Sequence, residues 1–327
     1  MSDKTEISWT DATWNPVVGC TKVSAGCDNC YAIRTARRMT ANPNPKVSAA
    51  YAGTEDGGEW TGRVNLLHSR LNQPLKWRNP RRIFVNAQSD LFHKDVPDDF
   101  IARVFAVMAL APQHTFQVLT KRHGRMRSLL RSSDFRSAVE DAIKGMVSAH
   151  QPKHVWYAAW PLPNVLVGVS VEDQATADLR IPALLDTPAA VRWISCEPLL
   201  GPVDLSDFVD RWHEGDGDAC DWGRCDRAAV AVRRDFTHED PRYVCMLPVC
   251  ERHRGLDWVV VGGESGPGAR PMHPEWVRSL RNQCASTGVA FHFKQAGSVL
   301  AREWGCTGKG TDPDEWPESF PREYPNA

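Results

Sequence analysis

The chain has 327 residues, of which 42% are hydrophobic and 24% are charged, and its formal net charge is −1 at pH 7. This balance is typical of a globular protein with a sizeable core, and it excludes a protein-wide basic field that would attract nucleic acid or anionic membranes. The sequence shows no signal peptide and no run of about 18 apolar residues, so we expect a cytoplasmic protein without membrane contact.

The predicted strands are short apolar runs rich in β-branched residues. After a short strand near residues 13–18, they lie at 83–87, 116–119, 165–169, 191–194, 258–261 and 289–293. Runs that are apolar throughout are typical of parallel strands buried on both faces.

Capping residues and prolines predict helices between these strands. The helices run from a cap at Asp98 or Asp99 to near Pro112, from a cap at Asp173 to about Leu185, and from Pro274 to Gly288. Strands that alternate with helices predict an α/β fold, which we expect to be a full or partial parallel β/α barrel over residues 1–300. A doubly wound open sheet is the main alternative.

Three segments depart from this alternation. Residues 40–80 are rich in Pro, Gly, Asn and Trp and predict an irregular excursion with a short helix. Residues 205–255 are polar and rich in cysteine, as expected of an insertion. Residues 301–327 hold several Pro, Gly, Glu and Asp residues, and we expect them to form an extended or partly disordered tail.

Polar residues follow the predicted strands directly. They are Ser89 and Asp90, Thr120 and Lys121, Ser170 and Glu172, Cys196 and Glu197, Gly262 with Gly263 and Glu264, and Lys294 and Gln295. In parallel α/β folds the carboxyl ends of the strands carry the working residues, so we expect this set to converge on one mouth. Each residue alone is explained as well by helix capping or by a loop hydrogen bond.

Three of the ten cysteines, Cys20, Cys27 and Cys30, lie within eleven residues of a polar loop. Cytosolic thiols stay reduced, so their clustering favours metal ligation over disulfides. Three thiolates suit a [4Fe–4S] cluster with one open iron, whereas zinc would need a fourth, distant ligand. Gly19 and Gly26 each precede a cysteine and let the backbone curl around an inorganic core. Reduced thiols packed in the core are the alternative.

Several blocks of the sequence carry a resemblance to a known family. In chain order they are GCTKVSAGCDNCYA, FVNAQSDLFHKDVP, FQVLTKR, VGVSVEDQ, SCEPLLGPVDL, DWVVVGGESGPGARPM and FHFKQAG. Over roughly residues 8–300, insertions aside, the chain resembles a phage-associated, three-cysteine-motif family of unknown function that looks like a divergent branch of the radical S-adenosylmethionine enzymes. The gaps between the cysteines are six and two residues, whereas the usual motif of that superfamily has three and two.

The resemblance implies an enzyme in which Cys20, Cys27 and Cys30 bind a [4Fe–4S] cluster whose fourth iron is chelated by S-adenosylmethionine. Reduction by an electron donor releases a 5′-deoxyadenosyl radical, which abstracts a hydrogen atom from a substrate. The implied cofactor-binding residues are Ser89 and Asp90 at the methionine amino group, Ser170 and Glu172 at the ribose, and Glu197, Gly262, Gly263 and Glu264 elsewhere at the mouth.

A second set of cysteines lies in the insertion with the spacing C-x4-C-x19-C-x4-C. It comprises Cys220, Cys225, Cys245 and Cys250. Two cysteine pairs predict a structural zinc site that holds together a segment too small to have its own core. A second iron–sulfur cluster and unligated cysteines are the alternatives.

Basic residues flank both the cysteine loop and one strand end. They are Arg34, Arg37 and Arg38 after the loop, and Lys121, Arg122, His123, Arg125, Arg127 and Arg131 after a strand. On helices they predict a solvated face, and beside the mouth they would favour a nucleotide or nucleic acid. Lys121 and Lys294 either bind an anionic group or pair with a neighbouring glutamate.

Two other functions fit these residues. One is a non-catalytic, metal-stabilised accessory or binding protein that works with a companion protein. The other is a zinc-dependent hydrolase, for which the chain lacks an HExxH-like helix.

The zinc hypothesis predicts that the purified protein contains zinc held by the insertion. Elemental analysis measures it, and a folded insertion without zinc would contradict the prediction.

Overall fold

The structure is a computed structural model that describes residues 5–147, 159–209 and 255–325. The second cysteine set, Cys220, Cys225, Cys245 and Cys250, lies outside the described residues. Within those ranges, each helix is too short or too polar to span a lipid bilayer.

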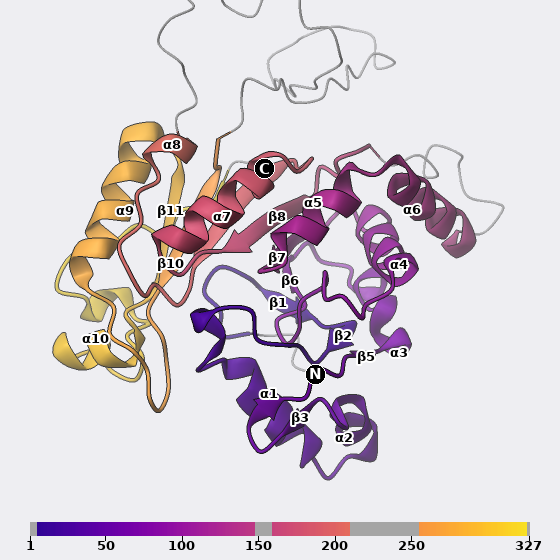
Figure 1. Cartoon of the computed structure of the whole chain (residues 1–327), viewed down its shortest axis with the longest axis horizontal. Coiled ribbons are helices and arrows are strands. Elements are labelled where there is room, and N and C mark those ends of the chain that lie inside the picture. The colour runs from indigo at the N-terminus through magenta and orange to yellow at the C-terminus, as the bar shows by residue number, and fades with distance from the viewer. Residues whose placement is uncertain (1–4, 148–158, 210–254, 326–327) are drawn as a thin grey trace, which may run out of the picture.

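The fold is built on a seven-stranded sheet in which all neighbours are parallel and the strands follow one another in chain order. The strands are β1 (Ala12–Trp14), β6 (Arg82–Val85), β7 (Thr115–Thr120), β8 (Val165–Ser170), β9 (Val191–Cys196), β10 (Trp258–Gly262) and β11 (Ala290–Gln295). The sheet curls into a half-barrel (Figure 1). A partial parallel barrel is therefore confirmed. The doubly wound alternative is wrong, because such a sheet reverses its strand order at a switch point.

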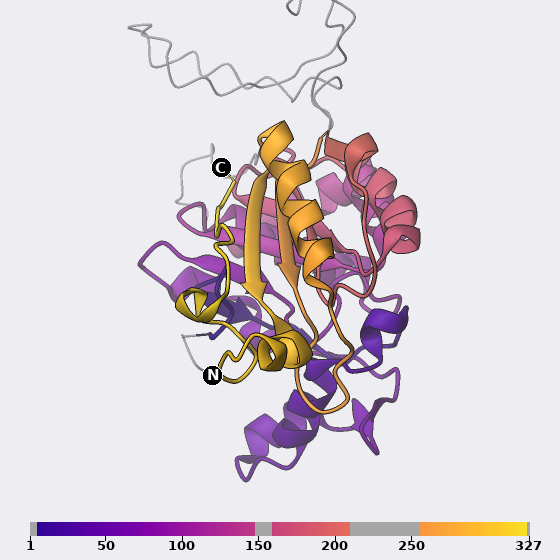
Figure 2. The same ribbon diagram turned by 90° about the vertical axis from the view of Figure 1, so that its left-hand side faces the viewer.

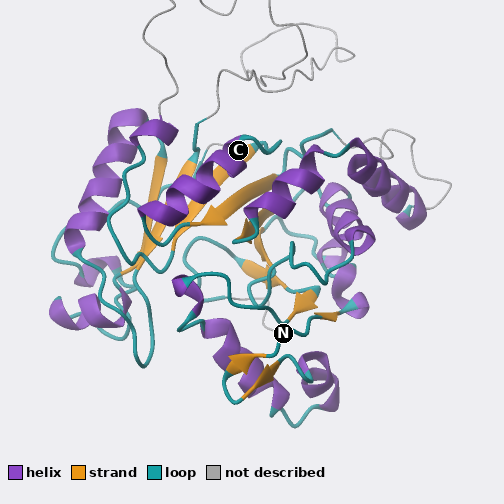
Figure 3. Cartoon of the chain, viewed as in Figure 1, coloured by secondary structure: helices purple, strands orange, loops and turns teal. Residues whose placement is uncertain are grey.

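Helices cover the outer side of this sheet and surround its carboxyl edge (Figure 3). On the outer side are α4 (Asp98–Ala109), α5 (His123–Arg131), α6 (Ser133–Met146), α7 (Gln174–Leu185) and α9 (Pro274–Thr287). The cysteine loop leads into α1 (Tyr31–Thr40). The excursion at residues 40–80 then contains α2 (Pro45–Tyr51), β3 (Glu55–Asp56), β4 (Glu59–Trp60), β5 (Asn65–Leu66) and α3 (His68–Leu71). The predicted strand at 13–18 is divided between β1 and β2 (Val17–Val18), and β2 pairs antiparallel with β5.

Local signals explain where the helices begin and end. Asp173 accepts a hydrogen bond from the Thr176 backbone at 2.9 Å and starts α7, and Gly288 ends α9 in the left-handed conformation, both as predicted. The predicted cap of α4 is wrong. Pro97 occupies the N-cap, and Asp98 lies in the first turn, where its charge favours the helix dipole.

The two faces of the sheet bury different side chains. The outer face packs valines, isoleucines and phenylalanines against the helices. The inner face is aromatic: Trp9, from the segment before β1, packs edge-on against Phe84, Trp193 and Trp258 at centroid distances of 4.7–6.1 Å. Gly168 leaves room for the Trp193 indole, because a Cβ at this position would approach the indole within 2.6 Å. The N-terminal segment therefore fills part of the half-barrel's concave side.

The ends of the undescribed stretch between β9 and β10 lie next to each other. The Leu256 backbone N–H donates to the Phe208 carbonyl at 3.2 Å, which joins α8 (Ser206–Val209) on one side to the residues just before β10 on the other. The chain thus leaves the half-barrel and returns at adjacent points.

The C-terminal segment differs from the expected extended or partly disordered tail. It begins with α10 (Gly297–Glu303), and Trp316 and Phe320 are buried against Phe293 of β11 at centroid distances of 4.7 Å. Arg322 forms an antiparallel bridge with His292, so the segment runs beside the edge strand (Figure 2). The Pro and Gly content of the segment does not predict this packing, because the packing depends on a few large aromatic side chains.

Replacing Trp316 tests this packing. Trp316→Ala removes a buried indole from the contact with Phe293, and we expect it to lower the free energy of unfolding by about 3–5 kcal/mol. Chemical denaturation measures the change, with exposed Glu303→Ala as control. Equal stability of the two variants would show that the tail is not part of the folded core.

Candidate functional site

The cysteine loop lies across the carboxyl ends of the strands. Residues 19–30 join β2 to α1, and Figures 1 and 2 show α1 beyond the edge toward which the strand arrows point. The loop contacts segments that follow four strands, β6, β7, β8 and β10. The three cysteines and the strand-end residues therefore share one mouth of the half-barrel.

The start of the loop is anchored to the end of β6. Gly19 forms a parallel bridge with Ser89, whose hydroxyl donates to the Val17 carbonyl at 2.9 Å. Gly19 has a φ of +91°, and a Cβ there would overlap the Arg63 carbonyl, so this position requires glycine. Ser89 thus fixes the backbone that leads into Cys20.

Cys20 lies beside an ion pair that is largely buried. The Arg122 guanidinium donates to Asp90 at 2.9 Å and approaches the Cys20 sulfur at 3.7 Å, and the Thr120 hydroxyl donates to Asp90 at 2.7 Å. Burial, and then the Asp90 carboxylate, raise the pKa of the Cys20 thiol to about 12. A metal bound at this sulfur would therefore displace a proton.

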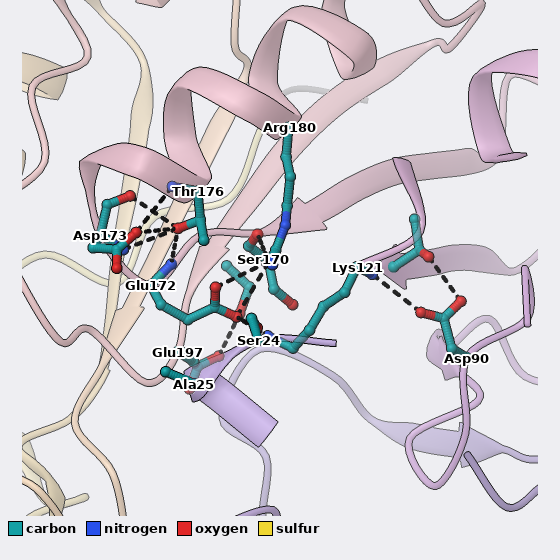
Figure 4. A network of polar contacts seen from close by, with 12 residues as sticks. Ser24, Ala25, Asp90, Lys121, Ser170, Glu172, Asp173, Thr176, Arg180 and Glu197 are labelled. Carbon is teal, nitrogen blue, oxygen red and sulfur yellow. Dashed lines mark hydrogen bonds and ion pairs between the residues drawn. The ribbon is translucent and has the colours of Figure 1, made fainter. Parts of the chain in front are cut away.

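Glu172, after β8, tethers the middle of the loop (Figure 4). Its side chain is 1% exposed, pairs with Lys121 and with Arg180 at 3.0 Å, and accepts a hydrogen bond from the Ser24 hydroxyl at 3.1 Å. Gly26 allows the close approach, since a Cβ there would lie 2.5 Å from the carboxylate. Burial alone would raise the pKa of Glu172, but the Lys121 and Arg180 charges more than offset it and leave the pKa below its ordinary value.

Glu264, after β10, holds the other side of the loop. It accepts hydrogen bonds from the Arg270 guanidinium at 2.6 and 3.0 Å and from the Asn29 amide at 2.9 Å. Arg270 also donates to the Ala25 carbonyl at 2.9 Å. Burial opposes ionisation, yet the bonds from Arg270 and Asn29 keep the pKa of Glu264 below its ordinary value. The loop is thus attached to the sheet through two ionised carboxylates.

The strand end after β9 carries a fourth paired carboxylate, after Asp90, Glu172 and Glu264. Glu197 pairs with Lys294 of β11 at 2.7 Å and accepts from the Ser195 hydroxyl at 3.0 Å. Gly262 lies close by, because a Cβ on it would be 2.8 Å from a Glu197 oxygen. Lys121 and Lys294 were expected either to bind an anionic group or to pair with a glutamate. Both lysines pair with a glutamate.

The three thiols are donors of the kind that an iron–sulfur cluster uses, and all three lie on the loop at the mouth. Cys27 closes the short 3₁₀ helix η1 (Ala25–Cys27), and Cys30 is the N-cap of α1, where burial raises the pKa of its thiol. Soft thiol donors on one loop are what such a cluster requires. Over the part of the chain that the structure describes, no three His, Cys, Asp or Glu side chains are gathered closely enough to hold a metal ion. The thiols would have to turn toward one another to bind a cluster.

Other predicted residues lie apart from the loop or are already neutralised. Cys196 is buried in the outer core, and Ser170 is buried, its carbonyl accepting a bond from Arg180 at 2.8 Å. In the basic run after β7, Arg125 pairs with Asp98 and Arg131 with Asp186. This run therefore offers little free positive charge.

The residues that sequence reasoning missed are the partners of the carboxylates. Arg180 lies on α7, and its side chain is buried. Its position eight residues after Glu172 was the one feature of the sequence that could have indicated their pairing. Arg270 is six residues after Glu264, within the irregular β10–α9 connection. Ser24 and Asn29 show no pattern beyond loop polarity.

Removing the Glu172 charge tests the tether. Glu172→Gln leaves Arg180, whose side chain is 3% exposed, without its ion pair, and we expect a loss of about 3–5 kcal/mol of stability at pH 7. Thermal and chemical denaturation measure it. Glu140→Gln, which breaks the surface pair with Arg136, is the control and should cost about 1 kcal/mol or less.

The same tether predicts a pH dependence. Because the pKa of folded Glu172 lies below its ordinary 4.5, its stabilisation is complete above that value and is lost as the pH falls through the folded pKa. The stability difference between wild type and Glu172→Gln should therefore shrink below about pH 4.5. A difference that stays constant into strong acid would contradict this assignment.

Comparison with known proteins gives a family but no characterised relative. No curated protein and no solved structure matches the chain. Residues 4–323 match a family described as a protein of unknown function, DUF5131. Since the match covers nearly the whole chain, this protein belongs to the DUF5131 family.

Proposed function

We propose that this protein is a radical S-adenosylmethionine-like iron–sulfur enzyme whose cluster is held by Cys20, Cys27 and Cys30. The observation that carries the proposal is the attachment of the cysteine loop, through Glu172 and Glu264, across the carboxyl ends of a parallel half-barrel. Parallel α/β folds place their chemistry at this edge.

Cys20, Cys27 and Cys30 would hold the cluster, which would supply the electron from an external donor for reductive cleavage of S-adenosylmethionine. The chain's own residues position the reactants. Glu172 and Glu264 hold the loop, and Asp90 holds Arg122 beside Cys20. These carboxylates act by fixing their neighbours, because their oxygens already accept several bonds.

The remaining strand-end residues are the proposed contacts for S-adenosylmethionine. Ser170 and Glu197 lie at the ends of β8 and β9, on the inner side of the mouth, and Gly262 and Gly263 lie at the end of β10. Glycines at this point let a ligand approach the backbone closely. Asp90 and Glu172 contribute through Arg122 and Lys121, which they orient.

A second candidate is a non-catalytic accessory protein that binds metal and works with a companion protein. It is favoured by the dispersed thiols and by the pairing of the strand-end carboxylates, which resemble a structural rather than a reactive mouth. The two candidates differ in whether S-adenosylmethionine is cleaved.

Anaerobic reconstitution with iron and sulfide tests the proposal. We expect about four irons per chain, visible iron–sulfur absorption, and release of 5′-deoxyadenosine that requires dithionite. Ala variants of Cys20, Cys27 and Cys30 should each lose most of the iron and all of the cleavage. Cys306→Ala, at a partly exposed thiol outside the loop, should keep both.

The outcomes separate the candidates. Bound iron without cleavage would favour the accessory protein. A colourless protein after reconstitution, or iron binding that survives in all three loop variants, would contradict the cluster assignment.

A further inference from the structure

One face of α1, which follows the cysteine loop directly, is exposed and carries an aromatic ring and arginines. Its opposite face is buried through Ala32, Ile33 and Ala36. Tyr31, Arg34 and Arg38 follow the helical spacing i, i+3 and i+7 and lie on the exposed side. We name this set, Tyr31 with Arg34 and Arg38, the α1 stripe.

The Tyr31 ring is fixed in place although 46% of the residue is exposed. Its hydroxyl donates to the Ala87 carbonyl at 2.6 Å, beyond the end of β6, while the residue itself begins α1 next to Cys30. A ring held in this way can stack on a flat partner without a further ordering cost.

The positive charge of α1 is not neutralised, in contrast to that of α5. The helix contains no acidic residue, and among the described residues Arg34 donates only to the Ser265 carbonyl. Across the described ranges, Arg37 and Arg38 form no ion pair. Acidic neighbours of the loop are already occupied: Asp28 lies 3.5 Å from Arg270, and Glu59 lies 2.7 Å from Lys22.

We infer that the α1 stripe binds single-stranded nucleic acid, with a base stacked on Tyr31 and phosphates bound by Arg38 and its neighbour Arg37. A fixed ring beside unpaired arginines is the chemistry that recognises an unpaired base and its backbone. A duplex hides the faces of its bases, and chemistry on a base requires that it leave the stack. The inference rests on the proposed function, for which it names the substrate class.

Fluorescence anisotropy on the cluster-free protein tests this inference apart from the cluster chemistry. The probes are labelled single-stranded DNA and RNA of about 12 nucleotides and the matching DNA duplex. We expect a single strand to bind more tightly than the duplex, and the two single-stranded probes identify the preferred sugar.

Variants assign the contacts. Tyr31→Ala should weaken single-strand binding about 5- to 100-fold, whereas Tyr31→Phe, which keeps the ring but loses the bond from the hydroxyl to Ala87, should weaken it less. Arg38→Ala should reduce the dependence of log Kd on log salt by about 0.7 for each phosphate that the variant no longer binds. Arg136→Ala, which makes the same charge change on distant α6, should alter neither value.

Three results would overturn the inference: no binding of either single strand, tighter binding of the duplex, or equal affinity of Tyr31→Ala and wild type. Polyglutamate that competes as well as unlabelled single strand would also overturn it, because it would assign the stripe to acidic protein. If the strand binds while reconstitution yields no cluster, the binding surface stands and the proposed reaction fails. If the cluster cleaves S-adenosylmethionine while no strand binds, the proposed reaction stands and the binding surface fails.

Discussion

The candidate site depends on buried carboxylates that bind the cysteine loop from below. The loop has little regular structure and few apolar side chains, so it cannot be held by hydrophobic packing. Glu172 and Glu264 replace that packing with charged hydrogen bonds to Ser24 and Asn29, and each is held in place by an arginine. A buried carboxylate stays ionised only with such partners. Loss of the loop contact, the carboxylate or the arginine would therefore destabilise the other two.

This arrangement divides the work of the mouth between two kinds of residue. The paired carboxylates supply rigidity, while the proposed function assigns the reactive surface to the thiols, the glycines and the small polar residues near them. Rigid support of reactive groups is the condition under which a site holds its geometry. The strand-end acids therefore matter most through the groups that they orient, such as Arg122 next to Cys20.

Sequence patterns predicted those parts of the molecule that depend on neighbours along the chain. The parallel strands were visible because each is apolar on both faces, and α7 and α9 were visible from Asp173 and Gly288. The position of Cys20, Cys27 and Cys30 at the strand ends followed from the fold. The partners of the acids could not be predicted, since Arg180 and Arg270 meet their carboxylates only once helix and loop are packed. The proline and glycine content of residues 301–327 predicts an extended or partly disordered tail. The observed packing depends instead on two buried aromatic side chains, Trp316 and Phe320.

The two terminal segments meet on the concave side of the sheet. Tyr324 donates to the Ser8 carbonyl at 2.9 Å across a sequence separation of 316 residues, and its ring lies against His292 and Trp258. During synthesis, Ser8 and Trp9 leave the ribosome long before the residues that cover them. The contact that covers this part of the inner surface therefore cannot form until the chain has been synthesised as far as Tyr324.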